Sequence, residues 1–390
     1  MNKSNLSLTV SEFSVKQCLE NFNLWKELID NSNYKFIYND YKWYQAFWKT
    51  YEGIYNSKIY VVIDNRTKSW FGILPTTLYK TGFVDLYTKI IAPSTSEYSD
   101  YFSPIIRNKY ANRVLPILLK KLFENYGSTH LFKLINVIDD KDMNSIIIDT
   151  LNQIGLTFKV STSLCPVLLL EGNEKSKILN SFKKKHRDDI KRQTKKLKGL
   201  GDLSFKVFEN KLQFEENFYQ FLNMYKNRWE SSNQISSMSK SKNELFFKTL
   251  LNTLDISNIH FSGLFLEGKP IAYHIGFYHN NWFYYYKPTY DIEYSNFSPG
   301  KIHIWYLIKR GCEEGWEGFD FLQGFEVYKK NWNNHTNSTF TYTIHKKNWI
   351  RFYWQIRLKD TFLKIARKIP DRLIFFTRSF INKSATKISQ

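Results

Sequence analysis

The sequence predicts a chain of mixed α and β structure (α+β or α/β), organised as two successive halves and a basic helical tail. Apolar side chains recur with helical spacing in some segments and form short runs, typical of strands, in others. From residue 200 onward these segments follow the order strand, two helices, three strands, helix, strand, helix. With 390 residues, 43% apolar and 24% charged, the chain can bury a core in each half.

The first half, residues 1–160, combines both kinds of segment. Three stretches have the apolar period of a helix, at Tyr41–Tyr51, Tyr110–Tyr126 and Asp142–Ile154. Three short apolar runs predict strands, at Ile59–Ile63, Trp70–Leu74 and Leu131–Val137. The first two runs are separated by Asp64–Ser69, a polar stretch that predicts a β-hairpin.

The second half, residues 161–345, opens with the apolar run Cys165–Leu170. Helices are expected at 177–198, Lys211–Trp229, Asn243–Leu254, Ser298–Glu314 and Glu326–Trp332. Strands are expected at Leu203–Phe208, His260–Leu266, Ile271–Tyr278, Trp282–Pro288 and Phe319–Leu322. The three consecutive runs between 260 and 288 are separated by turn residues, which predicts an antiparallel meander.

Composition excludes several classes of protein. No run reaches the ~18 apolar residues of a membrane-spanning helix, and the N-terminus lacks the apolar core of a signal peptide. We therefore expect a cytoplasmic protein. Three widely spaced cysteines argue against a disulfide framework and a zinc site, and the histidines His274, His279 and His303 have no metal-ligand spacing. We expect no metal.

The net charge of +20 is concentrated in two segments. Lys183–Lys198 carries nine lysines and arginines against two aspartates. Residues 346–390 form a tail with twelve lysines and arginines against two aspartates. Such segments suit nucleic acid, a membrane surface or a polyphosphate, although a solvated helix face is the simpler interpretation.

Within the tail, Trp349–Ile369 has the pattern of a basic amphipathic helix. An apolar stripe recurs every three or four residues at Trp354, Leu358, Phe362, Ile365 and Ile369, with basic residues around it. Such a helix could lie on an anionic membrane, which would place the protein peripherally at the inner face of the cell membrane. Docking of the helix onto the protein's own core is the alternative.

Two segments of the second half carry a family resemblance. The first is SFKKKHRDDIKRQTKKLKGLGDLSFKVFE (181–209). The second is GLFLEGKPIAYHIGFYHNNW… (263–332), which includes YSNFSPG and DFLQGFEVYKKNW. Both segments resemble acetyltransferases of the CelD/BcsL type, in the GNAT superfamily. This group is similar to the FemAB peptidoglycan-bridge transferases, which contain two GNAT-like subdomains. The resemblance implies two tandem GNAT-like subdomains with a mixed, largely antiparallel sheet flanked by helices, of which residues 1–160 would be degenerate.

The resemblance implies acyl-CoA, in the first place acetyl-CoA, as co-substrate. The start of the helix at Ser298, Gly300 and Lys301 would hold its phosphates, because a helix N-terminus offers free N–H groups and a positive dipole end. We also assign Gln323, Gly324 and Lys329, which follow the next strand, to donor binding. The usual GNAT phosphate motif is absent, and a plain helix cap with Ser298 as N-cap residue is the alternative.

Acyl transfer to an amine needs a base for the amine proton and an acid for the departing thiolate. Tyr328 stands where this superfamily often places the acid, and we assign it that role. Asp320, whose side chain should face opposite to Phe319 and Phe321, is assigned as the base or as the group that orients the amine. The alternatives are a structural strand-end carboxylate and a packed aromatic ring.

The basic helix would bind the acceptor through Lys185, His186, Arg187 and Arg192. A phosphorylated sugar or polysaccharide precursor is the acceptor class that the resemblance implies, and in FemAB relatives a comparable surface meets tRNA. The leading hypothesis is an N-acyltransferase acting on the amine of such a precursor. The alternatives are an aminoacyl-tRNA-dependent bridge transferase and a non-catalytic module that binds nucleic acid or membrane.

Overall fold

The computed structural model describes residues 6–345 except 34–35, 82–87, 127–129, 171–174 and 232–240. The basic tail, with the expected amphipathic helix Trp349–Ile369, lies outside the described residues. In the described part of the chain, no helix is both long and apolar enough to cross a membrane.

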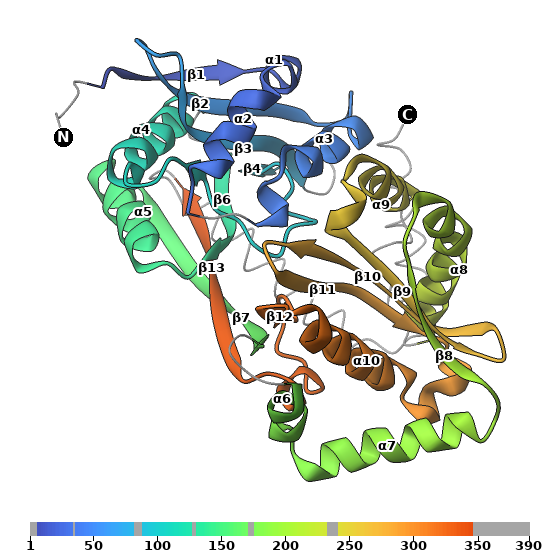
Figure 1. Cartoon of the computed structure of the whole chain (residues 1–390). Helices are drawn as coiled ribbons and strands as arrows, with labels where there is room; N and C mark the ends of the chain where they lie inside the picture. Colours follow the sequence, from blue (N-terminus) through green and yellow to red (C-terminus); the bar gives the residue numbers. More distant parts are fainter. Residues whose placement is uncertain are drawn as a thin grey trace, which may run out of the picture.

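The described strands form one sheet of thirteen strands that runs through both halves (Figure 1). Its order is β1-β2-β3-β4-β6-β13-β7-β12-β11-β10-β9-β8, with β5 beside β3. The first half supplies β1 (Leu8–Phe13), β2 (Asn56–Asp64), β3 (Trp70–Thr81), β4 (Thr88–Pro93), β5 (Ile105–Ile106) and β6 (His130–Ile138), and β7 (Thr157–Leu169) runs from the first half into the second. The second half supplies β8 (Leu203–Phe208), β9 (Ile259–Leu266), β10 (Lys269–His279), β11 (Trp282–Tyr290), β12 (Gly318–Asp320) and β13 (His335–His345).

Helices cover both faces of this sheet. One face carries helices from both halves, packed into a shared aromatic core: α1 (Val15–Glu20), α2 (Phe22–Asp30), α3 (Tyr41–Thr50), α8 (Lys211–Glu230) and α9 (Ser241–Thr253). The opposite face carries α4 (Ala111–Glu124) and α5 (Lys141–Gln153) over the first half. Over the second half it carries α6 (Lys175–Ser181), α7 (Lys184–Lys198) and α10 (Pro299–Glu314). Short 3₁₀ helices lie at η1 (Ile37–Asn39), η2 (Ile256–Asn258), η3 (Ile292–Phe297) and η4 (Lys329–Asn331).

The two halves are joined through the sheet itself. The last described strand, β13, lies between β6 and β7 and pairs antiparallel with both. Each half also contains one parallel pairing, β4 with β6 and β11 with β12, and the remaining pairings within the sheet are antiparallel. The expected mixed, largely antiparallel sheet flanked by helices is therefore confirmed.

Most expected elements are present, with three corrections. The expected helix 177–198 is two helices, α6 and α7, separated at Phe182–Lys183. The apolar run Cys165–Leu170 is the end of β7, which already begins at Thr157. The expected helix Glu326–Trp332 is a turn followed by the three-residue η4, because its N-terminal part is held in a loop by Lys329.

Candidate functional site

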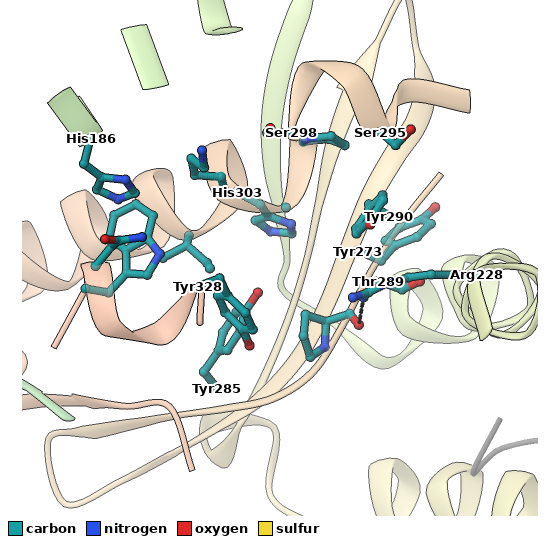
Figure 2. A pocket seen from close by; sticks show the side chains of 17 residues that line it. His186, Arg228, Tyr273, Tyr285, Thr289, Tyr290, Ser295, Ser298, His303 and Tyr328 are labelled. Carbon is teal, nitrogen blue, oxygen red and sulfur yellow. Dashed lines mark hydrogen bonds between the residues drawn. The ribbon is translucent and has the colours of Figure 1, made fainter. Parts of the chain in front are cut away.

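A pocket opens in the second half where β11 and β12 diverge. β12 pairs with β11 only at Trp282–Tyr284, whereas β10 follows β11 to Tyr290. After Asp320 the chain turns toward β7, and the Phe321 N–H donates to the Pro166 carbonyl at 3.0 Å. The free edge of β11, the start of α10 and the η4 segment enclose a cavity of about 270 Å³ (Figure 2).

The start of α10 faces this pocket. Ser298 is the N-cap residue of α10 and has left-handed backbone angles (φ 52°, ψ 51°), but its side chain makes no capping hydrogen bond. Its carbonyl accepts instead from the N–H groups of Lys301 (3.0 Å) and Ile302 (3.2 Å). A Cβ on Gly300 would lie 3.5 Å from Tyr290 Cδ1, so Gly300 leaves room between the helix start and that ring. The positive end of the α10 dipole thus points into an open space.

Lys301 lines the pocket, but its charge is already paired. Its Nζ lies 2.5 Å from Asp189 Oδ2 on α7, and Arg192 lies 2.5 Å from the other oxygen of the same carboxylate. The hydrogen bond from Lys301, followed by that from Arg192, lowers the pKa of Asp189. Lys301 therefore ties α10 to α7 in this structure.

Arg228, at the end of α8, brings a further cation to the pocket. Its Nη1 donates to the Pro288 carbonyl at 3.0 Å, and its guanidinium lies 4.4 Å from the centre of the Tyr290 ring (Figure 2). No carboxylate of the described residues forms an ion pair with it within 4.0 Å. Arg228 can therefore meet an anionic group of a ligand.

Two buried polar atoms at the pocket lack hydrogen-bond partners among the described residues: His186 Nε2 and Thr289 Oγ1. His186 is 8% exposed and its ring packs 4.4 Å from that of Trp332. Burial, with a smaller contribution from Lys301, lowers the pKa of His186, so the ring is neutral at neutral pH. Unpaired buried polar atoms are costly unless a ligand or water bonds to them.

Tyr328 lies directly before η4 and lines the pocket together with Tyr285 (Figure 2). Burial of its hydroxyl, aided by the Glu326 carboxylate and opposed by Arg228, raises the pKa of Tyr328. The phenol therefore keeps its proton at neutral pH and can donate it, or a hydrogen bond, to a developing anion in the pocket.

Asp320 lies outside the set of residues that line this pocket. Its carboxylate accepts from the Tyr101 hydroxyl at 2.8 Å and from the Leu322 N–H at 2.7 Å. As expected from the alternation, Phe319 and Phe321 pack on the α10 side, whereas Asp320 faces the other side. Burial raises the pKa of Asp320 to about 7, and the hydrogen bonds from Leu322 and Tyr101 partly oppose this.

Three residues assigned to the donor hold the loop after β12 instead of lining the pocket. Gln323 Nε2 donates to Asn136 Oδ1 (2.6 Å) and Thr339 Oγ1 (2.9 Å). The Gly324 N–H donates to the Leu164 carbonyl at 3.1 Å. Lys329 is 4% exposed and donates to the carbonyls of Gln323 (2.8 Å) and Gly324 (3.1 Å). These bonds fix the position of the neighbouring Tyr328.

Of the four basic-helix residues assigned to the acceptor, His186 reaches the pocket. Lys185 and Arg192 are exposed on α7, and Arg187 donates to Asn180 Oδ1 at 2.5 Å. Ser298, Gly300, Lys301 and Tyr328 line the same pocket as His186, although they are up to 142 positions apart in the chain.

Sequence reasoning missed several lining residues, among them Arg228, Tyr285, Thr289 and Tyr290. Arg228 lies 60 residues before Pro288, its hydrogen-bond partner, and no local pattern marks such a contact. Tyr285 lies in the expected strand Trp282–Pro288, whose apolar run predicts core, and Tyr290 lies beyond that run, at the end of β11. In the described residues, no group of three or more histidine, cysteine or acidic side chains could hold a metal ion.

Residues 184–330 match the family model of the acetyltransferase (GNAT) domain. This stretch contains α7 to α10 and all the residues that line the pocket except Asn331 and Trp332. No curated protein matches the chain significantly.

Three solved structures share the fold at low sequence identity. FemX is 11% identical, with 85% of this chain and 96% of that chain covered and a TM-score of 0.56. A tandem GNAT protein from the clavulanic acid biosynthesis pathway is 8% identical, with coverages of 88% and 100% and a TM-score of 0.51. A conserved protein of unknown function from Bacteroides thetaiotaomicron is 10% identical, with coverages of 87% and 100% and a TM-score of 0.52.

These similarities confirm two of the predictions. The fold is GNAT-like and is shared along its length with a tandem GNAT protein. The domain match identifies the chain as an acyltransferase and places the pocket inside the acetyltransferase domain.

Proposed function

We propose that the protein is an N-acyltransferase of the CelD/BcsL type. It would transfer an acyl group, in the first place acetyl, from acyl-CoA to the amine of a sugar or of a cell-surface polysaccharide precursor. The observation that supports this most is the pocket between the start of α10 and the free edge of β11, inside the acetyltransferase domain. The polysaccharide link rests on the family resemblance alone.

The donor's diphosphate would lie at the start of α10. There the helix dipole and the space left by Gly300 favour an anion, and Arg228 supplies a positive charge across the pocket. His186 Nε2 and Thr289 Oγ1 offer two further polar atoms without partners among the described residues. The thioester arm would follow the edge of β11 that β12 leaves unpaired.

In the reaction the amine nitrogen bonds to the acyl carbon, and the carbon–sulfur bond breaks. The amine proton would pass to the Asp320 carboxylate, directly or through a water. Its pKa of about 7 places this group near the ideal for a base at neutral pH. Tyr328 would give its proton to the departing thiolate from the other face of the sheet, where it lines the pocket. The gap between β11 and β12 is where a thioester would be accessible to both groups.

The direct test is release of free thiol from acetyl-CoA in the presence of amino sugars and their nucleotide-linked forms. We expect turnover that requires both the thioester and a free amine, with the amide as product. Absence of thiol release with every CoA thioester, together with absence of CoA binding, would contradict the proposal.

A second candidate is an aminoacyl-tRNA-dependent transferase of the FemAB kind. Two observations favour it: the pocket is rich in aromatic rings, and Lys301 is already paired with Asp189. The terminal adenosine of a tRNA, which carries few charges, would fit such a lining. Transfer from aminoacyl-tRNA without any use of CoA would establish this alternative.

A further inference from the structure

The outer face of α7 has no role in the pocket. The helix packs against α10 and η3, with a buried stripe at His186, Ile190, Gln193 and Leu197. Its exposed face carries seven cations against one acid, Asp188; the cations are Lys184, Lys185, Lys191, Arg192, Lys195, Lys196 and Lys198. In Figure 1 α7 lies along the lower edge of the molecule.

Large apolar side chains are exposed on the segments that adjoin α7. Leu200, in the turn after α7, is 55% exposed. Ile292, in η3, which contacts α7, is 41% exposed. A lysine-rich helix with protruding apolar side chains at its border is the pattern of a surface that binds anionic lipid headgroups and inserts a few side chains among them.

We propose that the outer face of α7, with Leu200 and Ile292, is a docking surface for an anionic lipid bilayer. The proposal goes beyond acyl transfer and does not depend on it. A straight helix of 15 residues, about 22 Å long, presents its charges along a line that a flat surface can meet.

The same features argue against a nucleic acid at this face. Six of its seven cations are lysines, and the one arginine, Arg192, is paired with Asp189. Recognition of phosphates in nucleic acids favours the planar fork of arginine, and single strands stack on aromatic rings. No aromatic side chain lies on the exposed face of α7.

Docking in this way would bring the pocket close to the bilayer. His186 lies on the inner side of the same helix and lines the pocket, so the headgroups would lie within about one helix diameter, ~10 Å, of the pocket wall. An acceptor held at a membrane surface would then be within reach.

The experiment uses the full chain and vesicles of phosphatidylcholine with about one third phosphatidylglycerol, compared with phosphatidylcholine alone. The variant K191Q/K195Q/K196Q/K198Q neutralises one end of the cationic face. Its matched control, K26Q/K49Q/K120Q/K141Q, removes the same charge from exposed lysines of the first half. We expect co-sedimentation of the wild type with the anionic vesicles, at least tenfold weaker binding of the α7 variant, and a change within twofold for the control.

Equal loss in both variants would overturn the proposal, because net charge and not α7 would then determine binding. Retention of binding by the α7 variant would also overturn it and would point to the tail. Binding of wild type to single-stranded RNA without binding to the anionic vesicles would assign the face to nucleic acid instead.

Two further measurements remain informative if the variant fails to fold. Raising the salt from about 0.1 M to about 0.5 M should release the wild type from the vesicles, since surface charges are screened. Leu200→Ser should weaken vesicle binding at constant charge. Salt-independent binding, or an unchanged affinity of Leu200→Ser, would contradict the proposed docking.

Discussion

Each half contains an antiparallel three-stranded unit, β2–β4 or β9–β11, that precedes a helix, α4 or α10, yet this helix packs differently in each half. In the first half, α4 lies so close to β3 that a Cβ on Gly72 would be 2.3 Å from Val114 Cγ1. In the second half, α10 begins at the pocket, with Ser298 in a left-handed conformation and Gly300 facing Tyr290. One topology therefore gives a closed core or a ligand site, depending on the residues at the helix start.

The interior under the two helices differs as well. The core under α4 is aliphatic and aromatic. Between α10 and the sheet lie three buried histidines, His260, His274 and His303, and His303 shares a 2.9 Å hydrogen bond with Ser262. The second half thus has a more polar interior next to its pocket.

The largest effect is expected from Tyr328→Phe, which removes a hydroxyl from the pocket and keeps the ring. If the phenol protonates the thiolate, kcat should fall by about 10²–10⁴-fold with little change in donor affinity. The matched change in the first half is Tyr110→Phe, at the residue before α4, and it should leave kcat unchanged. Thiol release measures both. A Tyr328→Phe enzyme with wild-type kcat would make Tyr328 a packing residue.

A second prediction concerns acid stability. Burial lowers the pKa of His260, His274 and His303, that of His303 to about 3. Below the ordinary value of about 6.5, the unfolded chain binds protons that the folded second half excludes. The free energy of unfolding should therefore fall by up to about 1.4 kcal/mol per pH unit for each histidine.

Amide hydrogen exchange at about pH 7 and at about pH 5, corrected for the intrinsic exchange rate, tests whether the second half loses stability on acidification while the first half does not. Amides of β9, β10 and α10 should lose protection, whereas those of α4 should keep it. His303→Gln retains a partner for Ser262 without titrating and should make the loss less steep. Equal loss of protection in the two halves would mean that they unfold as one unit.

A third prediction concerns Asp320, whose partner Tyr101 comes from the first half. Ionisation of a base with a pKa of about 7 should make kcat/KM rise with pH and level off above about 7. Tyr101→Phe removes a hydrogen bond that favours the carboxylate, so the rise should move to higher pH. A profile unaffected by Asp320→Asn would exclude this carboxylate as the base.

Stability gives an independent measurement on Asp320. The pKa of Asp320 in the folded protein is raised above the ordinary value of 3.8. Its stabilising contribution to the free energy of unfolding is therefore fully present below about pH 4 and is lost as pH rises through about 7. The wild type should therefore lose about 1.4 kcal/mol per pH unit across that range relative to Asp320→Asn. Denaturant unfolding at several pH values measures the difference, and parallel curves would contradict the burial of this group.

The sequence was most informative where the periodicity is local. The strands of the meander, the helices α3, α4 and α8, and the strand β8 follow from alternating or helical apolar patterns. β13 was missed because its sequence, HTNSTFTYTIH, is rich in polar residues; it forms a strand because β6 and β7 pair with it on both sides.

The features of the candidate site also divide into those that a local sequence pattern predicts and those that depend on contacts between distant residues. The start of α10 could be located from Ser298-Pro299-Gly300, because Pro and Gly have strong positional preferences there. Three contacts could not be predicted from the sequence, because each joins distant or irregular segments. They are the ion pair of Lys301 with Asp189, the hydrogen bond of Arg228 to Pro288, and the hydrogen bonds of Lys329 within its loop. The direction of Asp320 followed from alternation, but its partner Tyr101 lies 219 residues away.

The central claim is that the second half, at the start of α10, binds the donor. Calorimetric titration with CoA or acetyl-CoA tests it, with Gly300→Val compared with Asn112→Val, the equivalent second position of α4. The side chain of valine at Gly300 would occupy the space before Tyr290, so donor affinity should fall at least tenfold, about 1.4 kcal/mol. Asn112→Val should bind like the wild type. Unchanged affinity in a folded Gly300→Val protein, or no binding of CoA by the wild type, would contradict the account.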